Sequence, residues 1–458
     1  MTKALLEDAA RRAATYLQSL SERSVAAAPA AVAGLDVLED TLPEQPCDPA
    51  RVLALLDETV SPATMAMAGP RFFGFVIGGS LPAALAANWL AGAWDQNAAL
   101  GTVTPGVARV EAIALRWLID VLGLPATTQG AFVTGATMAN FTALAAARHR
   151  VLADAGWNVE ADGLFGAPPI TLIVGDEAHP TLFKSLGLLG LGRNRVVRVP
   201  TDSQGRMRVD RVPAIAGPTI VCVQAGNINS GAFDPFAEIC PVARDAGAWV
   251  HVDGAFGLWA KASPRLAPLA TGMELADSWA TDAHKWLNVP YDSGLAFVRE
   301  PGMLPAAMAI TAEYLPTNDA ERSPADFTPE LSRRARGVEV WAAMRSLGRR
   351  GLAELFERNC RQARRFAERL AAAGYEVLND VVLNQVVVSF GTPDANRQVI
   401  EAIQSDGTCW AGATTWRGRP GMRISVCSWA TTDADVERSA DAMIRAARSV
   451  LTSRQPSR

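Results

Sequence analysis

The feature that most constrains the fold of this chain is a series of short apolar runs with helical patterns between several of them. Most of the runs are bounded by Gly, Pro or Asp. They lie at residues 131–134, 170–174, 195–199, 219–224, 248–252, 278–281 and 295–298. Strands that are apolar on both faces, with helices between them, predict an α/β fold with a mainly parallel sheet.

The sequence on either side of this series predicts two further parts. The chain has 458 residues, and its first 70 are Ala-rich helical pieces interrupted by "LPEQPCDP", so we expect a helical arm over 1–70. The large α/β domain would span 71–310 and include a helix from about 105 to 121, where apolar residues recur at helical spacing. An irregular stretch, an Arg-rich helix, two strands and a closing helix follow. They predict a loop and a small α+β C-terminal domain over 311–458.

Charge, hydropathy and residue spacing disfavour several classes of function. The net charge of -4 gives no reason to expect nucleic acid or an anionic membrane as a partner. The longest apolar stretch (81–94) is too short to span a bilayer. The four histidines lack H-x-x-x-H spacing, which disfavours a metal site. The N-terminus lacks the apolar core of a signal peptide and the cysteines are scattered singly, so we expect a cytoplasmic protein.

Lys285 stands out because lysine is rare in this chain. Lys and Arg together number 43, but only residues 3, 184, 261 and 285 are lysine. Lys285 follows an apolar run and precedes Trp286. A desolvated lysine can lose its proton and attack an aldehyde, which arginine cannot do. The alternative is a peripheral or salt-bridged lysine.

Asp253 ends another apolar run, in "WVHVDGAFG". Open α/β sheets bind ligands at the carboxyl ends of their parallel strands. Two roles are open from the residues alone: a helix cap, or a partner for a protonated heterocyclic nitrogen. The second role is reasonable because a buried carboxylate needs a compensating partner.

A glycine turn and a histidine complete the set of candidate residues. "FVTGATMANF" reads as a strand, a turn and a helix start, where the N–H groups of Gly135, Ala136 and Thr137 could hold a phosphate. Glycine turns of this kind are common, so the motif is weak by itself. His179 follows a strand; it is either a structural histidine or a flat ring that stacks on a flat cofactor.

Taken together, these motifs resemble the group II pyridoxal-phosphate (PLP) dependent amino-acid decarboxylases, which include the aromatic-amino-acid, glutamate and diaminobutyrate enzymes. The resemblance covers roughly residues 65 to 450 and rests chiefly on "HVDGAFG" (251–257) and "DAHKWLNVPYDSG" (282–294), supported by "DEAHPTLFKS" (176–185) and "GNINSGAFDP" (226–235). It implies the fold of type I PLP-dependent transferases, a homodimer with active sites at its interface, and an amino-acid substrate.

The resemblance also implies roles for individual residues, which stay expectations here. Lys285 would bind the cofactor's aldehyde, Asp253 would keep the pyridine nitrogen protonated, and His179 would stack on the ring. The remaining cofactor contacts would come from Gly135, Ala136, Thr137, Asn227, Ala255 and His284. The substrate would lose CO2 through an external aldimine and a quinonoid to give an amine. Substrate contacts would come from Phe75, Trp94, Asn97 and Arg423.

One departure from the family pattern concerns the proton donor. Many members carry a tyrosine on a mobile loop that protonates Cα, and in "SPADFTPEL" the matching place is Phe327. Phenylalanine has no proton to donate, so the alternative reaction is an oxygen-dependent decarboxylation–deamination that forms an aldehyde, ammonia and hydrogen peroxide. A carbon–carbon lyase, an aminotransferase and a non-catalytic relic of the fold remain more distant alternatives.

Overall fold

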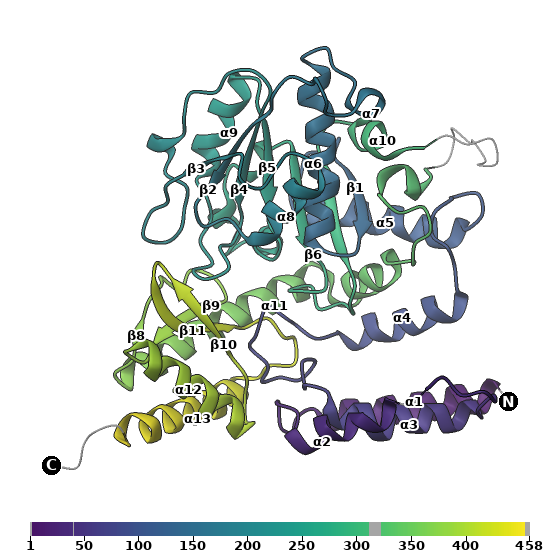
Figure 1. The fold of residues 1–458 in the computed structure, drawn as a ribbon, viewed down its shortest axis with the longest axis vertical. Coiled ribbons are helices and arrows are strands. Elements are labelled where there is room, and N and C mark those ends of the chain that lie inside the picture. The colour runs from purple at the N-terminus through teal and green to yellow at the C-terminus, as the bar shows by residue number, and fades with distance from the viewer. Residues whose placement is uncertain (1, 40, 311–321, 454–458) are drawn as a thin grey trace. The chain divides into compact units, whose positions relative to one another are not determined.

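The structure is a computed structural model that describes residues 2–39, 41–310 and 322–453 (Figure 1). The chain divides into two compact units. The large unit comprises Gly78–Arg361 and Asn379–Gln385, and the small unit comprises Met1–Ile77, Gln362–Leu378 and Val386–Arg458.

These units do not follow the boundaries expected at residues 70 and 310. The N-terminal helices group with the C-terminal α+β part, and the described residues after 321 up to 361 group with the large unit. A buried ion pair helps to explain the second difference. Arg333 Nη1 lies 2.9 Å from Glu111 Oε2, and the same guanidinium donates to the carbonyl of Phe132. This segment is therefore tied to the large sheet.

The large unit is built on a seven-stranded sheet in the order β1-β7-β6-β5-β4-β2-β3. Only β7 runs antiparallel to its neighbours. All seven predicted strands are confirmed within a residue or two, and so is the mainly parallel sheet. Their bounds are β1 Gln129–Val133, β2 Thr171–Gly175, β3 Val196–Val199, β4 Thr219–Gln224, β5 Trp249–Asp253, β6 Ser278–Asp282 and β7 Gly294–Val298.

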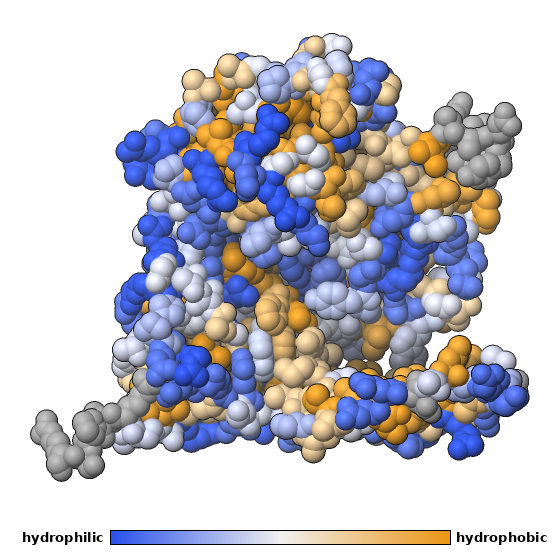
Figure 2. Space-filling view, in the orientation of Figure 1, coloured by the Kyte–Doolittle hydropathy of each residue, from blue (hydrophilic) through white to orange (hydrophobic). Residues whose placement is uncertain are grey.

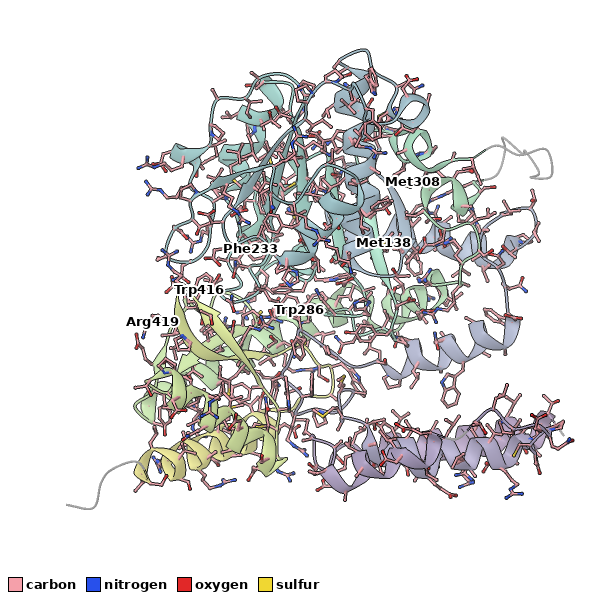
Figure 3. All side chains as sticks on the ribbon, viewed as in Figure 1. Met138, Phe233, Trp286, Met308, Trp416 and Arg419 are labelled. Atoms are coloured by element: carbon pink, nitrogen blue, oxygen red, sulfur yellow. The ribbon has the colours of Figure 1, made fainter. Side chains whose placement is uncertain are left out.

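Helix α6 lies across one face of this sheet, in contact with β5, β6 and β7 (Figure 1). Its buried side chains are mostly alanines, which let the helix approach the strands closely. Met138 and Met308 (Figure 3) are partly buried and pack against the resulting core. The helices of the large unit are α4 Pro82–Trp94, α5 Pro105–Val121, α6 Ala136–Ala153, α7 Val159–Asp162, α8 Pro180–Leu188, α9 Phe236–Asp245 and α10 Met303–Met308.

The small unit combines N-terminal helices with a four-stranded sheet in the order β10-β11-β9-β8. The predicted strands near 385–390 and 421–427 correspond to β9 and β11, while β8, β10 and α12 were not predicted. The bounds are α1 Thr2–Ser19, α2 Pro29–Ala33, α3 Pro49–Ala63, β8 Glu376–Val377, β9 Gln385–Ser389, α12 Pro393–Asp406, β10 Gly412–Trp416, β11 Arg419–Ser425 and α13 Asp433–Thr452.

Helix α11 (Gly337–Ala372) belongs to both units and is interrupted at Gly348, whose φ of 59° is not helical. The predicted Arg-rich helix, 352–373, is its second part. Across the described ranges, no helix combines the length and the apolar character that crossing a bilayer would require.

Candidate active site

The glycine turn between β1 and α6 lies directly against the segment that carries Lys285. Gly135 precedes the first turn of α6. A Cβ at Gly294, the first residue of β7, would lie 2.4 Å from the Gly135 Cα, which is too close for any side chain. A Cβ at Gly135 would lie 3.2 Å from His284 Cε1. Gly294 is therefore needed for the close approach of these two backbone segments, and a side chain at Gly135 would crowd His284.

Lys285 follows β6 and points its amine at a carboxylate that ends the same strand. Its Nζ lies 3.1 Å from Asp282 Oδ2, and the side chain is 18% exposed. Asp282 Oδ1 accepts a hydrogen bond of 2.5 Å from the Ala136 N–H at the start of α6. The lysine and the glycine turn, which lie some 150 residues apart in sequence, are thus joined through Asp282.

His284 is held in a fixed orientation beside this carboxylate. Its Nδ1 accepts a hydrogen bond from the Ser293 N–H, and its Nε2 lies 3.5 Å from Asp282 Oδ1. The ring stacks on Tyr291 with 4.2 Å between the centroids. Burial lowers the pKa of His284, which favours a neutral imidazole with its proton on Nε2.

Asp253 ends the neighbouring strand β5, and its carboxylate is buried. Oδ1 accepts from the Ala255 N–H and Oδ2 from Asn140 Nδ2, each at 3.3 Å. Burial raises the pKa of the Asp253 carboxyl, while the charges of His179 and Lys285 pull that pKa down again. Both groups therefore influence Asp253 electrostatically.

A buried chain of hydrogen bonds orients the Asp253 carboxylate through Asn140. Asn140 donates to Asp253, so its Oδ1 is the atom that accepts from His251 Nε2 at 2.9 Å. His251 Nδ1 then accepts from Ser278 Oγ at 2.9 Å, and Ser278 accepts from Trp249 Nε1 at 2.8 Å. Burial lowers the pKa of His251 to about 3, so the imidazole is neutral and every donor has an acceptor.

Two other predicted cofactor residues have clear structural roles. His179 caps the N-terminus of α8, where its Nδ1 accepts from the Thr181 N–H. Asn227 is buried; its Oδ1 accepts from the N–H groups of Asn229 and Ser230, and its Nδ2 donates to Gln224. A contact of Asn227 with a cofactor would compete with these bonds, so that role stays a prediction. Thr137 accepts a bond from Ser185 through its carbonyl, which leaves its N–H and hydroxyl for other partners.

The predicted substrate residues are divided between the two units. Trp94 ends α4 and is 49% exposed, and the Asn97 side chain accepts from the Arg333 N–H. Phe75 and Arg423 belong to the small unit. Burial lowers the pKa of Arg423 to about 10, so its guanidinium is partly desolvated. The substrate roles of these residues stay predictions.

Phe327 is largely buried, and its catalytic role stays a prediction. It was expected on the catalytic loop, but its ring is only 8% exposed and belongs to the core cluster that includes residues of β1, α6 and β7. The Arg322 guanidinium covers the ring, with its Cζ 3.9 Å from the ring centroid. Residues 311–321, which precede this segment in the expected loop and include Tyr314, lie outside the described residues. The placement of Phe327 supports a packing role and gives no support to a catalytic one.

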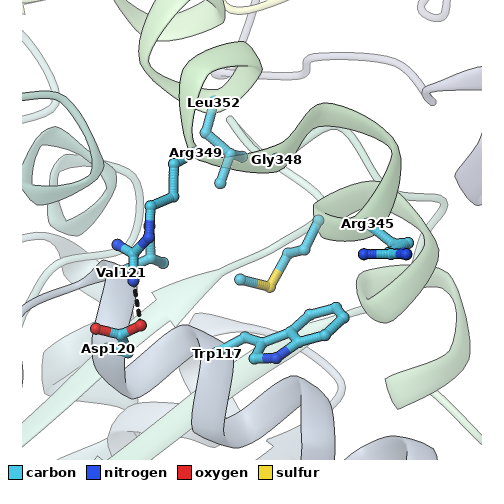
Figure 4. Close-up of a pocket in the computed structure, with 8 residues that line it drawn as sticks. Trp117, Asp120, Val121, Arg345, Gly348, Arg349 and Leu352 are labelled. Atoms are coloured by element: carbon cyan, nitrogen blue, oxygen red, sulfur yellow. Dashed lines mark hydrogen bonds and ion pairs between the residues drawn. The ribbon is translucent and has the colours of Figure 1, made fainter.

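A separate cavity of about 270 Å³ lies between α5 and α11 (Figure 4). Trp117, Met344 and Leu352 form its apolar wall, next to the interruption of α11 at Gly348. Asp120 and Arg349 pair at its rim. None of the residues predicted for the active site lines this cavity, so we do not assign the reaction to it. Among the described residues, no group of His, Cys, Asp and Glu side chains is arranged to bind a metal ion.

Comparison with known proteins decides the family. Residues 33–391 match the family model described as the pyridoxal-dependent decarboxylase conserved domain. The chain belongs to this family. Membership makes PLP the cofactor, and the residues around Lys285 fit it: a lysine amine, a buried carboxylate with free acceptor capacity, and a glycine turn at a helix N-terminus.

Individual relatives differ in the reactions that their names describe. The chain is 29% identical to an aromatic-L-amino-acid decarboxylase of Bacillus atrophaeus, over 68% of this chain and 65% of that protein. It is 23% identical to a phenylacetaldehyde synthase of Arabidopsis thaliana, over 88% of this chain and 87% of that protein. The chain therefore spans just under two thirds of the first relative and most of the second.

A solved structure shows the same fold. The crystal structure of Oryza sativa TDC with PLP and tryptamine superimposes with a TM-score of 0.90 at 24% identity, and covers 98% of both chains. At this identity the likeness speaks for the fold alone. The expected type I fold of PLP-dependent enzymes is confirmed.

Proposed function

We propose that this protein decarboxylates an L-amino acid to an amine and CO2. The observation that carries the proposal is the convergence of Lys285 and Asp253 at the ends of β6 and β5, beside the glycine turn of α6. When bound, PLP supplies an aldehyde for a lysine amine and a protonated ring that accepts the electrons of the breaking Cα–carboxylate bond.

The residues of this chain would perform four tasks around that cofactor. Lys285 would bind the cofactor covalently and release it when the substrate amine takes its place. Asp253, oriented by Asn140 and His251, would accept a hydrogen bond from the protonated ring nitrogen; among the described residues, its buried carboxylate makes no ion pair. The N–H groups at the start of α6 would hold the phosphate. His179 would pack against the ring.

A product assay tests this proposal. The PLP-loaded protein is incubated with the standard amino acids, diaminobutyrate and dihydroxyphenylalanine, with and without oxygen, and CO2, amine, aldehyde and peroxide are measured together. We expect equal amounts of amine and CO2 from one substrate, independent of oxygen. Aldehyde and peroxide formed only with oxygen would instead establish the second candidate function, oxidative decarboxylation–deamination, which the phenylacetaldehyde synthase relative keeps open.

The structure changes what is expected of a Phe327→Tyr variant. The new hydroxyl would be buried in an apolar cluster, so the free energy of unfolding should fall by about 1–3 kcal/mol. The ratio of amine to aldehyde should stay that of the wild type, because the ring packs in the core. Urea unfolding and the product assay measure the two effects. A shift of the products towards amine would instead support a catalytic role for residue 327.

We also propose that the protein is a homodimer. Helices α1 and α3 contain no buried residue, although both carry apolar side chains. Val52, Leu55 and Leu56 of α3 are 44%, 44% and 50% exposed, and apolar residues are visible on these helices in Figure 2. An apolar helix face of this kind is normally covered. A second copy of the chain is the occupant that the family resemblance implies.

A charge placed on this face tests the homodimer. The double variant Leu55→Glu, Leu56→Glu should weaken dimerisation by roughly 10²-fold or more, because both copies bury the added carboxylates. Sedimentation velocity at micromolar concentration measures the change. Phe165→Glu, at a residue that is 98% exposed in a loop, is the control and should remain dimeric. A wild-type protein that sediments as a monomer would contradict the proposal.

A further inference from the structure

The carboxylate of Asp282 occupies the place where an anion from the cofactor is expected. Its Oδ1 accepts the Ala136 N–H bond at the N-terminus of α6, an 18-residue helix. Its Oδ2 pairs with the Lys285 amine at 3.1 Å. The side chain is 3% exposed, and its own backbone N–H is fixed by a bond to the Ala255 carbonyl. One buried acid therefore engages both the phosphate turn and the reactive lysine.

These two contacts oppose the binding of the cofactor. A phosphate group needs the N–H groups at the start of α6, and one of them is already taken by a carboxylate. Two anions at one helix end also repel each other. The Lys285 amine also contacts the Asp282 carboxylate, and it must leave that contact before it can attack an aldehyde. Both contacts must therefore be given up as the cofactor enters.

We propose that Asp282 is an internal anion at the cofactor site, and that it limits the affinity for PLP until the phosphate displaces it. The geometry favours this over a simple helix cap. An ordinary cap comes from the residue that precedes the helix, and here that residue is Gly135, which has no side chain. The acid comes instead from β6, and its second oxygen contacts the lysine.

The turn is closely packed around the Asp282 carboxylate. A Cβ at Gly135 would already meet Asp282 Oδ1 at 3.4 Å and His284 Cε1 at 3.2 Å. The imidazole of His284 is neutral because burial lowers its pKa, so it does not balance the charge of a second anion. Lys285 lies within ion-pair distance of Asp282, and its amine would form the covalent bond to the cofactor.

The test compares the apoproteins of the wild type and Asp282→Asn, which keeps the shape of the side chain and removes its charge. Binding of PLP is followed by absorbance titration. We expect the Kd of the variant to fall about 3–30-fold, the range of charge effects at helix termini. Asp282→Ala should change the Kd in the same direction. Asp120→Asn, an exposed acid that pairs with Arg349, controls for net charge and should leave the Kd unchanged.

Two further probes separate the phosphate contact from the lysine contact without any measurement of activity. Inorganic phosphate should raise the melting temperature of apo Asp282→Asn more than that of the apo wild type. Pyridoxal, which lacks the phosphate, should gain less affinity from the substitution than PLP does. An unchanged or weakened affinity for PLP in both Asp282 variants would overturn the proposal, and so would equal stabilisation of both apoproteins by inorganic phosphate.

Discussion

Replacing Lys285 by alanine is expected to abolish decarboxylation, with a loss of about 10³–10⁶-fold in kcat. The visible absorbance that PLP acquires on the wild-type protein should also disappear, because that absorbance requires a covalent bond to a lysine amine. Lys285 is the candidate because its amine lies at the phosphate turn, 3.1 Å from Asp282, and its charge acts on Asp253. Absorbance spectra and single-turnover assays of the purified variant measure both effects.

Two variants make this result specific. Lys285→Arg keeps the positive charge beside Asp282 but has no amine that can form the bond, so it should be as inactive as the alanine variant. Lys261→Ala removes another of the few lysines, one that pairs with Glu274 at 3.2 Å, and should retain both absorbance and activity. If Lys285→Arg kept substantial activity, the lysine would act through its charge and the covalent role would be wrong.

Replacing Asp253 by asparagine should separate cofactor binding from catalysis. We expect PLP to remain covalently attached, with its visible absorbance, while kcat falls by about 10²–10⁴-fold. An amide cannot hold the ring nitrogen in its protonated form, so the ring accepts electrons less well. Absorbance titration reports the attachment and the product assay reports kcat, so the two effects are read independently.

Asp234→Asn is the matched control for Asp253→Asn. Asp234 is also a buried acid of the large unit, and burial raises its pKa to about 6. Its oxygens accept bonds from the N–H groups of Met207 and Gln224, so its role is to hold loops together. This variant should lose stability while its kcat per folded molecule stays close to that of the wild type. Equal losses of kcat in the two variants would contradict a specific role of Asp253 in keeping the ring nitrogen protonated.

Much of the fold could be predicted from the sequence, because short apolar runs between turn residues are a local pattern. Each strand of the large sheet is a short apolar run between turn residues, so all seven could be placed in advance. The reversed direction of β7 could not, since an apolar run looks the same in either direction. Strands β8 and β10 were missed for the opposite reason. β8 has two residues, and β10 alternates exposed and partly buried positions without an apolar run.

The candidate site was only partly readable for a related reason. Lys285, Asp253 and His284 stand in short motifs at the ends of apolar runs, and the structure brings them together. Asn140 and Asp282 went unnoticed because each acts through a partner more than a hundred residues away. One local feature could have pointed to Asp282: it is the last residue of a strand and lies three positions before Lys285. The burial of Phe327 was not predicted, because its neighbours in sequence carry no information about the core residues that cover it.

The amino-acid sequence by itself determined the α/β class and the positions of the strands in the large sheet, and it singled out Lys285 and Asp253 as candidates for binding PLP. These properties depend on local patterns of apolar and special residues. Only the tertiary structure decided that Phe327 packs in the core, that His251 and Asn140 orient Asp253, and that Asp282 faces both Lys285 and the start of α6. Those features depend on contacts between segments that are distant in the sequence, and such contacts produce no periodic pattern in the sequence itself.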